Sequence, residues 1–162
     1  MIVSDRMNKA LNKQITHELD ASYNYLAMSA AFHDMGLKIF AKRFANQSEE
    51  ERGHALKIIG YLQDVHSPVQ FDALNKPKSD YATAAAVVKT ALDSELVVTR
   101  QINDLVALAE SEKDYTTRGF LHWFVNEQIE EVSSMQELLQ WVEMAGDKNL
   151  FVLENRLAAT MK

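Results

Sequence analysis

Four stretches of the chain repeat an apolar stripe at helical spacing, and carboxylates interrupt each stripe near mid-length. Alternating steps of three and four residues place these side chains on the core-facing side of a helix. No Lys or Arg lies on the stripes, although burying an unpartnered carboxylate costs, in the idealised Born treatment, on the order of tens of kcal/mol. A multivalent cation would compensate such charges, so the pattern predicts a metal site inside a four-helix bundle. The third line runs through Ala84, Val88, Ala91, Glu95, Val98, Ile102, Leu105 and Ala109, and the fourth through Phe120, Phe124, Glu127, Glu131, Ser134, Leu138 and Trp141. The carboxylates and the histidine on the four lines are Glu18, Glu51, His54, Glu95, Glu127 and Glu131.

The composition predicts one cytoplasmic domain covering residues 1–162. Zero Cys excludes disulfides, thiolate metal ligands and a cysteine nucleophile, and agrees with a reducing compartment. The formal charge of −6 argues against nucleic-acid binding, which depends on neutralising phosphates. No segment approaches the roughly 20 apolar residues of a membrane span, so we expect no membrane partner.

Helix-terminating signals divide the chain into four long helices and a short fifth. Ser4 and Asp114 are suitable N-caps, while Gly36 and Gly146 can adopt the left-handed conformation that ends a helix. The stretch 65–79 holds both prolines and is long for a bundle connection, where roughly 2–8 residues are usual. Such a crossover lets the second and third helices run parallel. The expected long helices lie within about 5–145, with the second at 37–64 and the third at 80–110, and the short fifth helix covers about 147–160.

Glu51 and His54 form a Glu-x-x-His pair on one helix, close enough to ligate one metal ion or two adjacent ions. Such a pair is a weak signal by itself, but Glu18, Glu95 and Glu131 lie at comparable depth on three other stripes. Mixed carboxylate and imidazole ligation suits iron, manganese or zinc, and Glu51 could bridge two ions. The alternative is a core salt-bridge network or polar layer, which the absence of basic residues on the stripes disfavours.

These residues make the chain resemble the bacterial non-haem ferritins over essentially its full length. Ferritin-like di-iron proteins in general carry one Glu on each of two helices and a Glu-x-x-His on each of the other two. This sequence matches the pattern on three helices, but Ser134 stands where the second His is expected. The segment Trp123–Gln128 resembles the ferritin segment that supplies a Gln beside the iron.

The resemblance implies a site for each of two irons, one formed by Glu18, Glu51 and His54 and the other by Glu51, Glu95 and Glu131. A third iron site would match Glu50, Glu127, Glu130 and Glu131, although Glu50 and Glu130 could instead be solvated. Gln128 would lie beside this metal centre, more as a hydrogen-bond donor than as a ligand. Tyr25 matches the family's tyrosine beside the iron pair, where it is either an electron donor and hydrogen-bonding partner or a core tyrosine.

The resemblance further implies an all-α ferritin-like bundle acting as a ferroxidase. Fe(II) would be oxidised by O2 or H2O2 and stored as Fe(III) oxyhydroxide inside a hollow homo-oligomer of 24 subunits. We expect no haem, because Arg52 stands where a bacterioferritin has a haem-ligating Met. Two alternatives remain open, namely another di-metal carboxylate oxidoreductase such as a di-manganese catalase or an oxygenase, and a DNA-protecting mini-ferritin.

Overall fold

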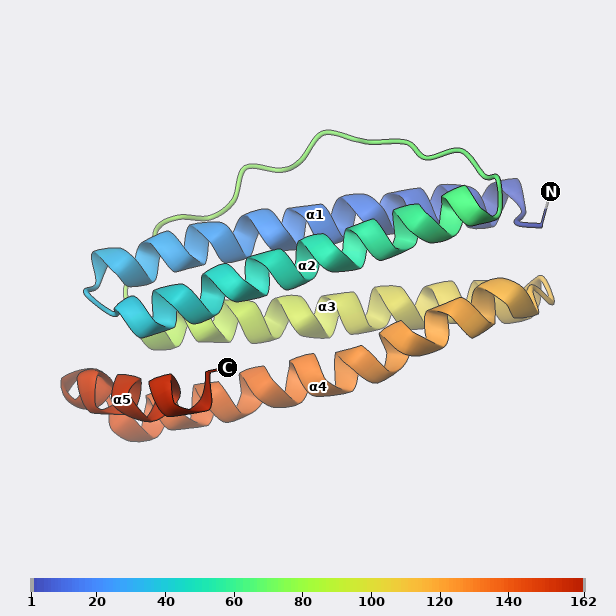
Figure 1. The fold of residues 1–162 in the computed structure, drawn as a ribbon. Helices are drawn as coiled ribbons and strands as arrows, with labels where there is room; N and C mark the ends of the chain where they lie inside the picture. The colour runs from blue at the N-terminus through green and yellow to red at the C-terminus, as the bar shows by residue number, and fades with distance from the viewer. Residues whose placement is uncertain (1, 162) are drawn as a thin grey trace.

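The computed structural model describes residues 2–161, and within that range every regular element is helical. Four long helices are followed by one turn of 3-10 helix and a short terminal helix (Figure 1). None of the described helices combines the length and hydropathy needed to span a membrane. The elements are α1 (Asp5–Asp34), α2 (Lys38–Asp64), α3 (Ala84–Ser111), α4 (Tyr115–Ala145), η1 (Asp147–Asn149) and α5 (Leu150–Thr160).

Side-chain caps and glycines set the helix ends. Ser4 accepts a hydrogen bond from the amide of Met7, and Asp114 from that of Thr117, so both predicted N-caps are confirmed. Gly36 and Gly146 have φ of 79° and 64°, a region that favours glycine. The predicted start of the third helix at residue 80 is wrong, because the Thr83 hydroxyl caps the amide of Ala86 and the helix begins after it.

The chain forms two antiparallel helical hairpins, α1–α2 and α3–α4, joined by a long crossover. The crossover runs the length of the bundle beside α1, so α2 and α3 are parallel, as predicted (Figure 1). Side chains of α1 hold the crossover in place: Asn12 accepts from the Gln70 amide at 2.7 Å, and Asp20 accepts from the Asn75 amide at 2.8 Å. These contacts satisfy part of the backbone of a segment that has no regular secondary structure.

The apolar core is divided into two clusters, one toward each end of the bundle. One contains Leu11, Ile58 and Phe124, and the other contains Phe32 and Phe40. Between them lies a layer of buried polar side chains, which we call the carboxylate layer. Its members are Gln14, Glu18, Gln47, Glu51, His54, Glu95, Gln128 and Glu131. Apolar packing on both sides therefore isolates the layer from water along the bundle axis.

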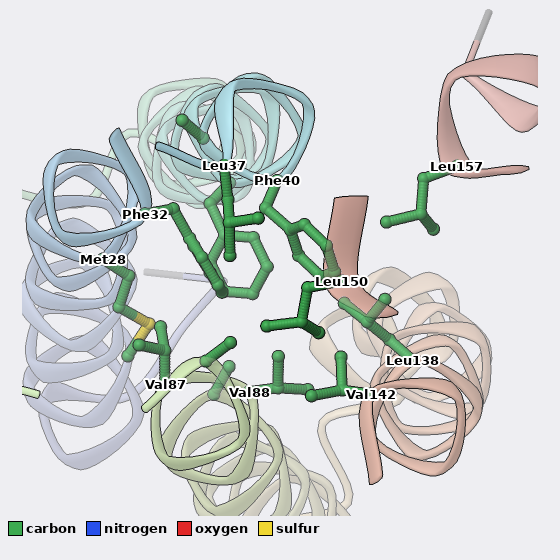
Figure 2. Close-up of a cluster of buried hydrophobic side chains, with 14 of the residues drawn as sticks. Met28, Phe32, Leu37, Phe40, Val87, Val88, Leu138, Val142, Leu150 and Leu157 are labelled. Atoms are coloured by element: carbon green, nitrogen blue, oxygen red, sulfur yellow. The ribbon is translucent and has the colours of Figure 1, made fainter. Parts of the chain in front are cut away.

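Helix α5 packs against one end of the bundle and completes the second cluster. Figure 2 shows Leu150 pointing into that cluster between Phe40 of α2 and Val142 of α4. The first turn of α2 has no cap from its own N-cap residue. Instead, Glu154 of α5 accepts hydrogen bonds from the amides of Ile39 at 2.7 Å and Phe40 at 3.1 Å. Because helix N-termini carry unpaired N–H groups and a positive dipole end, this carboxylate fixes α5 to α2.

Candidate metal centre

All four long helices contribute an acid to the carboxylate layer. Glu18 comes from α1, Glu51 from α2, Glu95 from α3 and Glu131 from α4, with exposed fractions of 0%, 1%, 2% and 5%. His54 of α2 is 6% exposed. Each side chain points inward because it lies on the face of its helix whose other buried positions are mostly apolar. The structure therefore brings together five residues that the sequence predicts to meet.

These side chains form two overlapping groups of potential metal ligands. Ligand atoms of Glu18, Glu51 and His54 lie within 4.8 Å of one another, and the same holds for Glu51, Glu95 and Glu131. Glu51 belongs to both groups, so its carboxylate could bridge two neighbouring cations. Among the described residues, no Lys or Arg nitrogen lies within 4.0 Å of these four carboxylates.

His54 faces two of the acids with its Nδ1 atom. Nδ1 lies 3.1 Å from Oε2 of Glu51 and 3.8 Å from Oε2 of Glu18. Burial would lower the pKa of His54, but the two adjacent carboxylates, Glu18 and Glu51, outweigh it and raise the pKa to about 11. In the metal-free protein this imidazole is therefore a cation at neutral pH. A metal ion that binds Nδ1 must displace its proton.

Two buried glutamines determine which carboxylate oxygens stay free. Gln14 Nε2 donates to Oε1 of Glu18 at 2.8 Å. Gln47 Nε2 donates at 2.8 Å both to Oε1 of Glu51 and to Oε2 of Glu131, joining α2 to α4. Oε2 of Glu18 is buried with no hydrogen-bond partner among residues 2–161, as expected of an atom that binds a cation.

Sequence reasoning did not assign a role to either glutamine. Each precedes a ligand on its own helix by four residues, Gln14 before Glu18 and Gln47 before Glu51. Residues separated by four positions are neighbours on a helix surface. A Gln one turn before a buried Glu was therefore the available signal.

Tyr25 and Gln128 hold the acid of α3 from two sides. The Tyr25 hydroxyl donates to Oε1 of Glu95, while Gln128 Nε2 lies 3.3 Å from Oε2 and 3.2 Å from the Glu95 carbonyl oxygen. Burial, followed by the charges of Glu95 and Glu51, raises the pKa of Tyr25 well above its usual value. In this arrangement Gln128 acts as a donor, and Tyr25 is a neutral hydrogen-bonding partner of the layer.

The crowding of carboxylates keeps protons in the layer. Burial, and next the charge of Glu51, raise the pKa of Glu131 to about 8 and that of Glu95 to about 7. Burial likewise raises the pKa of Glu51, against the lowering effect of His54. Like charges in a poorly solvated space cannot all ionise without a counter-ion. The layer can therefore hold either protons or metal cations.

A pocket of about 400 Å3 opens beside the layer and is lined by the residues predicted for a third iron. Glu50 and Glu130 are exposed at its wall, and Glu127 is partly buried. Ligand atoms of His54, Glu127 and Glu131 lie within 4.8 Å of one another, whereas Glu50 and Glu130 belong to no such group. The structure thus places Glu127 against the layer and leaves Glu50 and Glu130 in the outer pocket.

One prediction about α4 is wrong in detail. Glu127 was predicted to point into the core, yet Gln128 is the buried residue, with 4% exposure. The α4 core line runs through Leu121, Gln128 and Met135, each one residue after the predicted position. Both lines fit a helical period, and burial of Leu121 and Met135 favours the observed one.

Comparisons with known proteins agree with this geometry. A family model described as a ferritin-like domain matches residues 8–145. A bacterial non-heme ferritin of Staphylococcus aureus (strain USA300) is 35% identical over 160 residues, covering 98% of this chain and 96% of the relative. The chain belongs to the ferritin family. A ferritin of Staphylococcus haemolyticus (strain JCSC1435) is 34% identical over the same length.

The solved structures similar to this ferritin include an open pore ferritin from the hyperthermophilic archaeon Archaeoglobus fulgidus. That structure superposes with a TM-score of 0.94 at 33% identity and covers 96% of each chain. A form of the same archaeal ferritin engineered to be closed gives a TM-score of 0.93. The predicted ferritin-like fold is therefore confirmed. Family and fold support a role in iron storage, and the carboxylate layer is compatible with a metal site.

Proposed function

We propose that this ferritin is a ferroxidase, an Fe(II):oxygen oxidoreductase that oxidises Fe(II) with O2 or H2O2 and stores the Fe(III) as an oxyhydroxide mineral. The observation that carries the proposal is Glu51, which belongs to both buried ligand groups. Two adjacent irons can supply two electrons to one oxidant at once. Carboxylate oxygens, as hard anionic ligands, favour Fe(III) over Fe(II) and so promote the oxidation.

The proposed roles follow from the contacts in the layer. Glu18 and His54 hold one iron with Glu51, while Glu95 and Glu131 hold the second with Glu51. Iron binding expels the proton of His54 and those shared by the acids, because their raised pKa values depend on the layer lacking another cation. The apolar clusters on both sides exclude water along the bundle axis.

Three neighbouring residues act through these ligands. Tyr25 and Gln128 donate hydrogen bonds to Glu95 and fix its orientation, and we propose that Tyr25 also donates an electron. Trp123, whose ring centroid is 5.5 Å from that of His54, packs on the outer side of the imidazole. We further propose a third iron position in the adjoining pocket, with ligands Glu50, Glu127, Glu130 and Glu131.

We propose that the chain, as one ferritin-like domain, assembles into a cytoplasmic homo-oligomeric shell, with 24 subunits expected from the family. The net charge of −6 argues against the DNA-coating role of a mini-ferritin. Haem binding is not expected, because Arg52 takes the position of the haem-ligating Met of bacterioferritins. A di-manganese catalase would share the ligand types but would form no mineral-filled shell.

The test compares Fe(II) oxidation in the wild type and in Glu51→Ala by stopped-flow absorbance. Loss of the shared ligand should abolish the fast phase, whereas Glu49→Ala, which alters an exposed acid two positions away, should preserve it. Size-exclusion mass and iron content after Fe(II) loading test the shell and the mineral. Undiminished fast oxidation in Glu51→Ala would refute the assignment.

A further inference from the structure

A half-buried arginine lies next to the carboxylate layer, between α2 and α4. Arg43 lines the same 400 Å3 pocket as Glu50, Glu127, Glu130 and Glu131. Its Nη2 atom donates to the Ser134 hydroxyl at 2.9 Å. Across the described residues, no carboxylate oxygen lies within 4.0 Å of its guanidinium. The pocket therefore contains a positive charge that forms no direct ion pair with the acids beside it.

The guanidinium of Arg43 contacts the residue that stands where the second histidine of the di-iron pattern is expected. Ser134 follows Glu131 by three residues, where a second Glu-x-x-His would place an imidazole. Here the serine hydroxyl accepts a hydrogen bond from the Arg43 guanidinium instead, so a cation is held against this position of α4. Arginine stays protonated in proteins. Burial lowers the pKa of Arg43, and the charges of Glu137, Glu50 and Glu131 act in the opposite direction.

We propose that Arg43 lowers the affinity of the outer pocket for a third divalent cation. The inference rests on the proposed function, because it concerns the third iron position. A guanidinium and a divalent cation in one pocket repel each other, and this repulsion offsets part of the attraction from the surrounding carboxylates. The two overlapping ligand groups of the carboxylate layer then fill first. An ion in the outer pocket exchanges quickly and can move on to the interior of the proposed shell.

Four variants separate charge from shape. Arg43→Gln removes the charge but keeps a hydrogen-bond donor for Ser134. Arg43→Leu fills similar space but has neither the charge nor the donor. Arg43→Lys keeps the charge. Lys42→Gln is the matched control, because it removes one positive charge from the neighbouring, exposed position on α2. Size-exclusion chromatography and circular dichroism check that each variant is assembled and folded. If one of the two uncharged variants does not fold, the other one provides the test.

The measurement is calorimetric titration of the metal-free proteins with Zn(II), a redox-inert ion that accepts carboxylate and imidazole ligands. In Arg43→Gln and Arg43→Leu the affinity for the third ion per subunit should rise about tenfold or more. It should change less than about twofold in Arg43→Lys and Lys42→Gln. A third ion that is detectable only in the uncharged variants would also support the proposal.

Two results would overturn it. An unchanged or lowered third-ion affinity in both uncharged variants would show that the charge does not limit binding. An equal rise in Arg43→Lys would assign the effect to shape. The first two ions report separately on the proposed function, which fails if the wild type binds no tight pair of ions. If the pair binds tightly but the affinity for the third ion is unaltered in the uncharged variants, only the role of Arg43 is refuted.

Discussion

Replacing Glu131 by Gln should stabilise the metal-free protein. In the unfolded chain this carboxyl has a pKa near 4.5, and in the folded chain burial and then the charges of Glu51 and Glu95 raise its pKa to about 8. At pH 7 folding must therefore protonate this carboxyl. The cost is about 1.4 kcal/mol for each pH unit between 4.5 and 7, which amounts to about 3.5 kcal/mol. Glutamine is neutral and similar in shape, so it avoids this cost and can still accept from Gln47.

The expected gain is about 1–3 kcal/mol, since the neighbouring acids share the effect. For a chain of this size that corresponds to a Tm increase of about 3–10 °C. The assay is thermal unfolding monitored by circular dichroism, with chelator present, from pH 5 to pH 8.5. Glu143→Gln, an exposed change on the same helix, is the control and should shift Tm little.

The pH dependence gives a second, independent readout. A folded pKa above the unfolded one means that the folded protein binds more protons between pH 4.5 and pH 8, so stability falls as pH rises through that window. The wild-type Tm should therefore fall between pH 5 and pH 8, and the Glu131→Gln curve should be flatter. Saturating Zn(II) should reverse the ranking, because the wild type gains binding energy that the variant partly loses. A lower Tm for Glu131→Gln at every pH would refute the reasoning and indicate a hydrogen-bonded network that needs the acid.

Three further predictions concern the surroundings of the layer. Zn(II) binding at pH 7 should release about two protons per subunit, since the pKa values of His54 and Glu131 are raised to about 11 and about 8; calorimetry in buffers of different ionisation enthalpy measures the number, and a value of zero would contradict it. Gln47→Leu should weaken Zn(II) binding by roughly 10- to 100-fold, as loss of a ligand-orienting partner does, while the exposed change Gln63→Leu should have no effect in the same titration. Glu154→Ala should cost about 1–2 kcal/mol of α5 docking; hydrogen exchange should then accelerate at the two α2 amides that Glu154 caps, and unchanged protection would refute the capping role.

Periodicity alone predicted the core of α3, and that of α2 except at its last turns, where Leu62 is buried in place of the predicted Tyr61. On α3 every residue of the predicted line, from Ala84 to Ala109, is buried, with Glu95 the one acid among apolar side chains. On α4 two adjacent lines were possible, because polar and apolar residues occur on both. The choice between Glu127 and Gln128 depended on packing against α3, where Gln128 reaches the Glu95 carbonyl. Helical spacing cannot decide between two such lines.

Long-range contacts account for what the sequence did not predict. Gln47 joins two acids that are 80 positions apart (51 and 131), and Arg43 finds its partner Ser134 on another hairpin. Similarly, Glu154 caps a helix whose start lies more than 100 residues earlier. Each of these polar side chains would be equally acceptable on a solvated helix face. Their roles exist only once the hairpins pack together.

The carboxylate layer links the stability of the fold to metal binding. Four acids and one imidazole occupy a space closed by apolar residues on both sides, and none has a Lys or Arg within ion-pair distance among the described residues. Without cations the layer retains protons, and a metal ion must displace each retained proton because both compete for the same ligand atoms. The glutamines that hold one oxygen of an acid leave Oε2 of Glu18 free for that ion. If cations bind as proposed, a layer that is costly for the folded chain by itself would become favourable, and we expect its affinity for them to rise with pH.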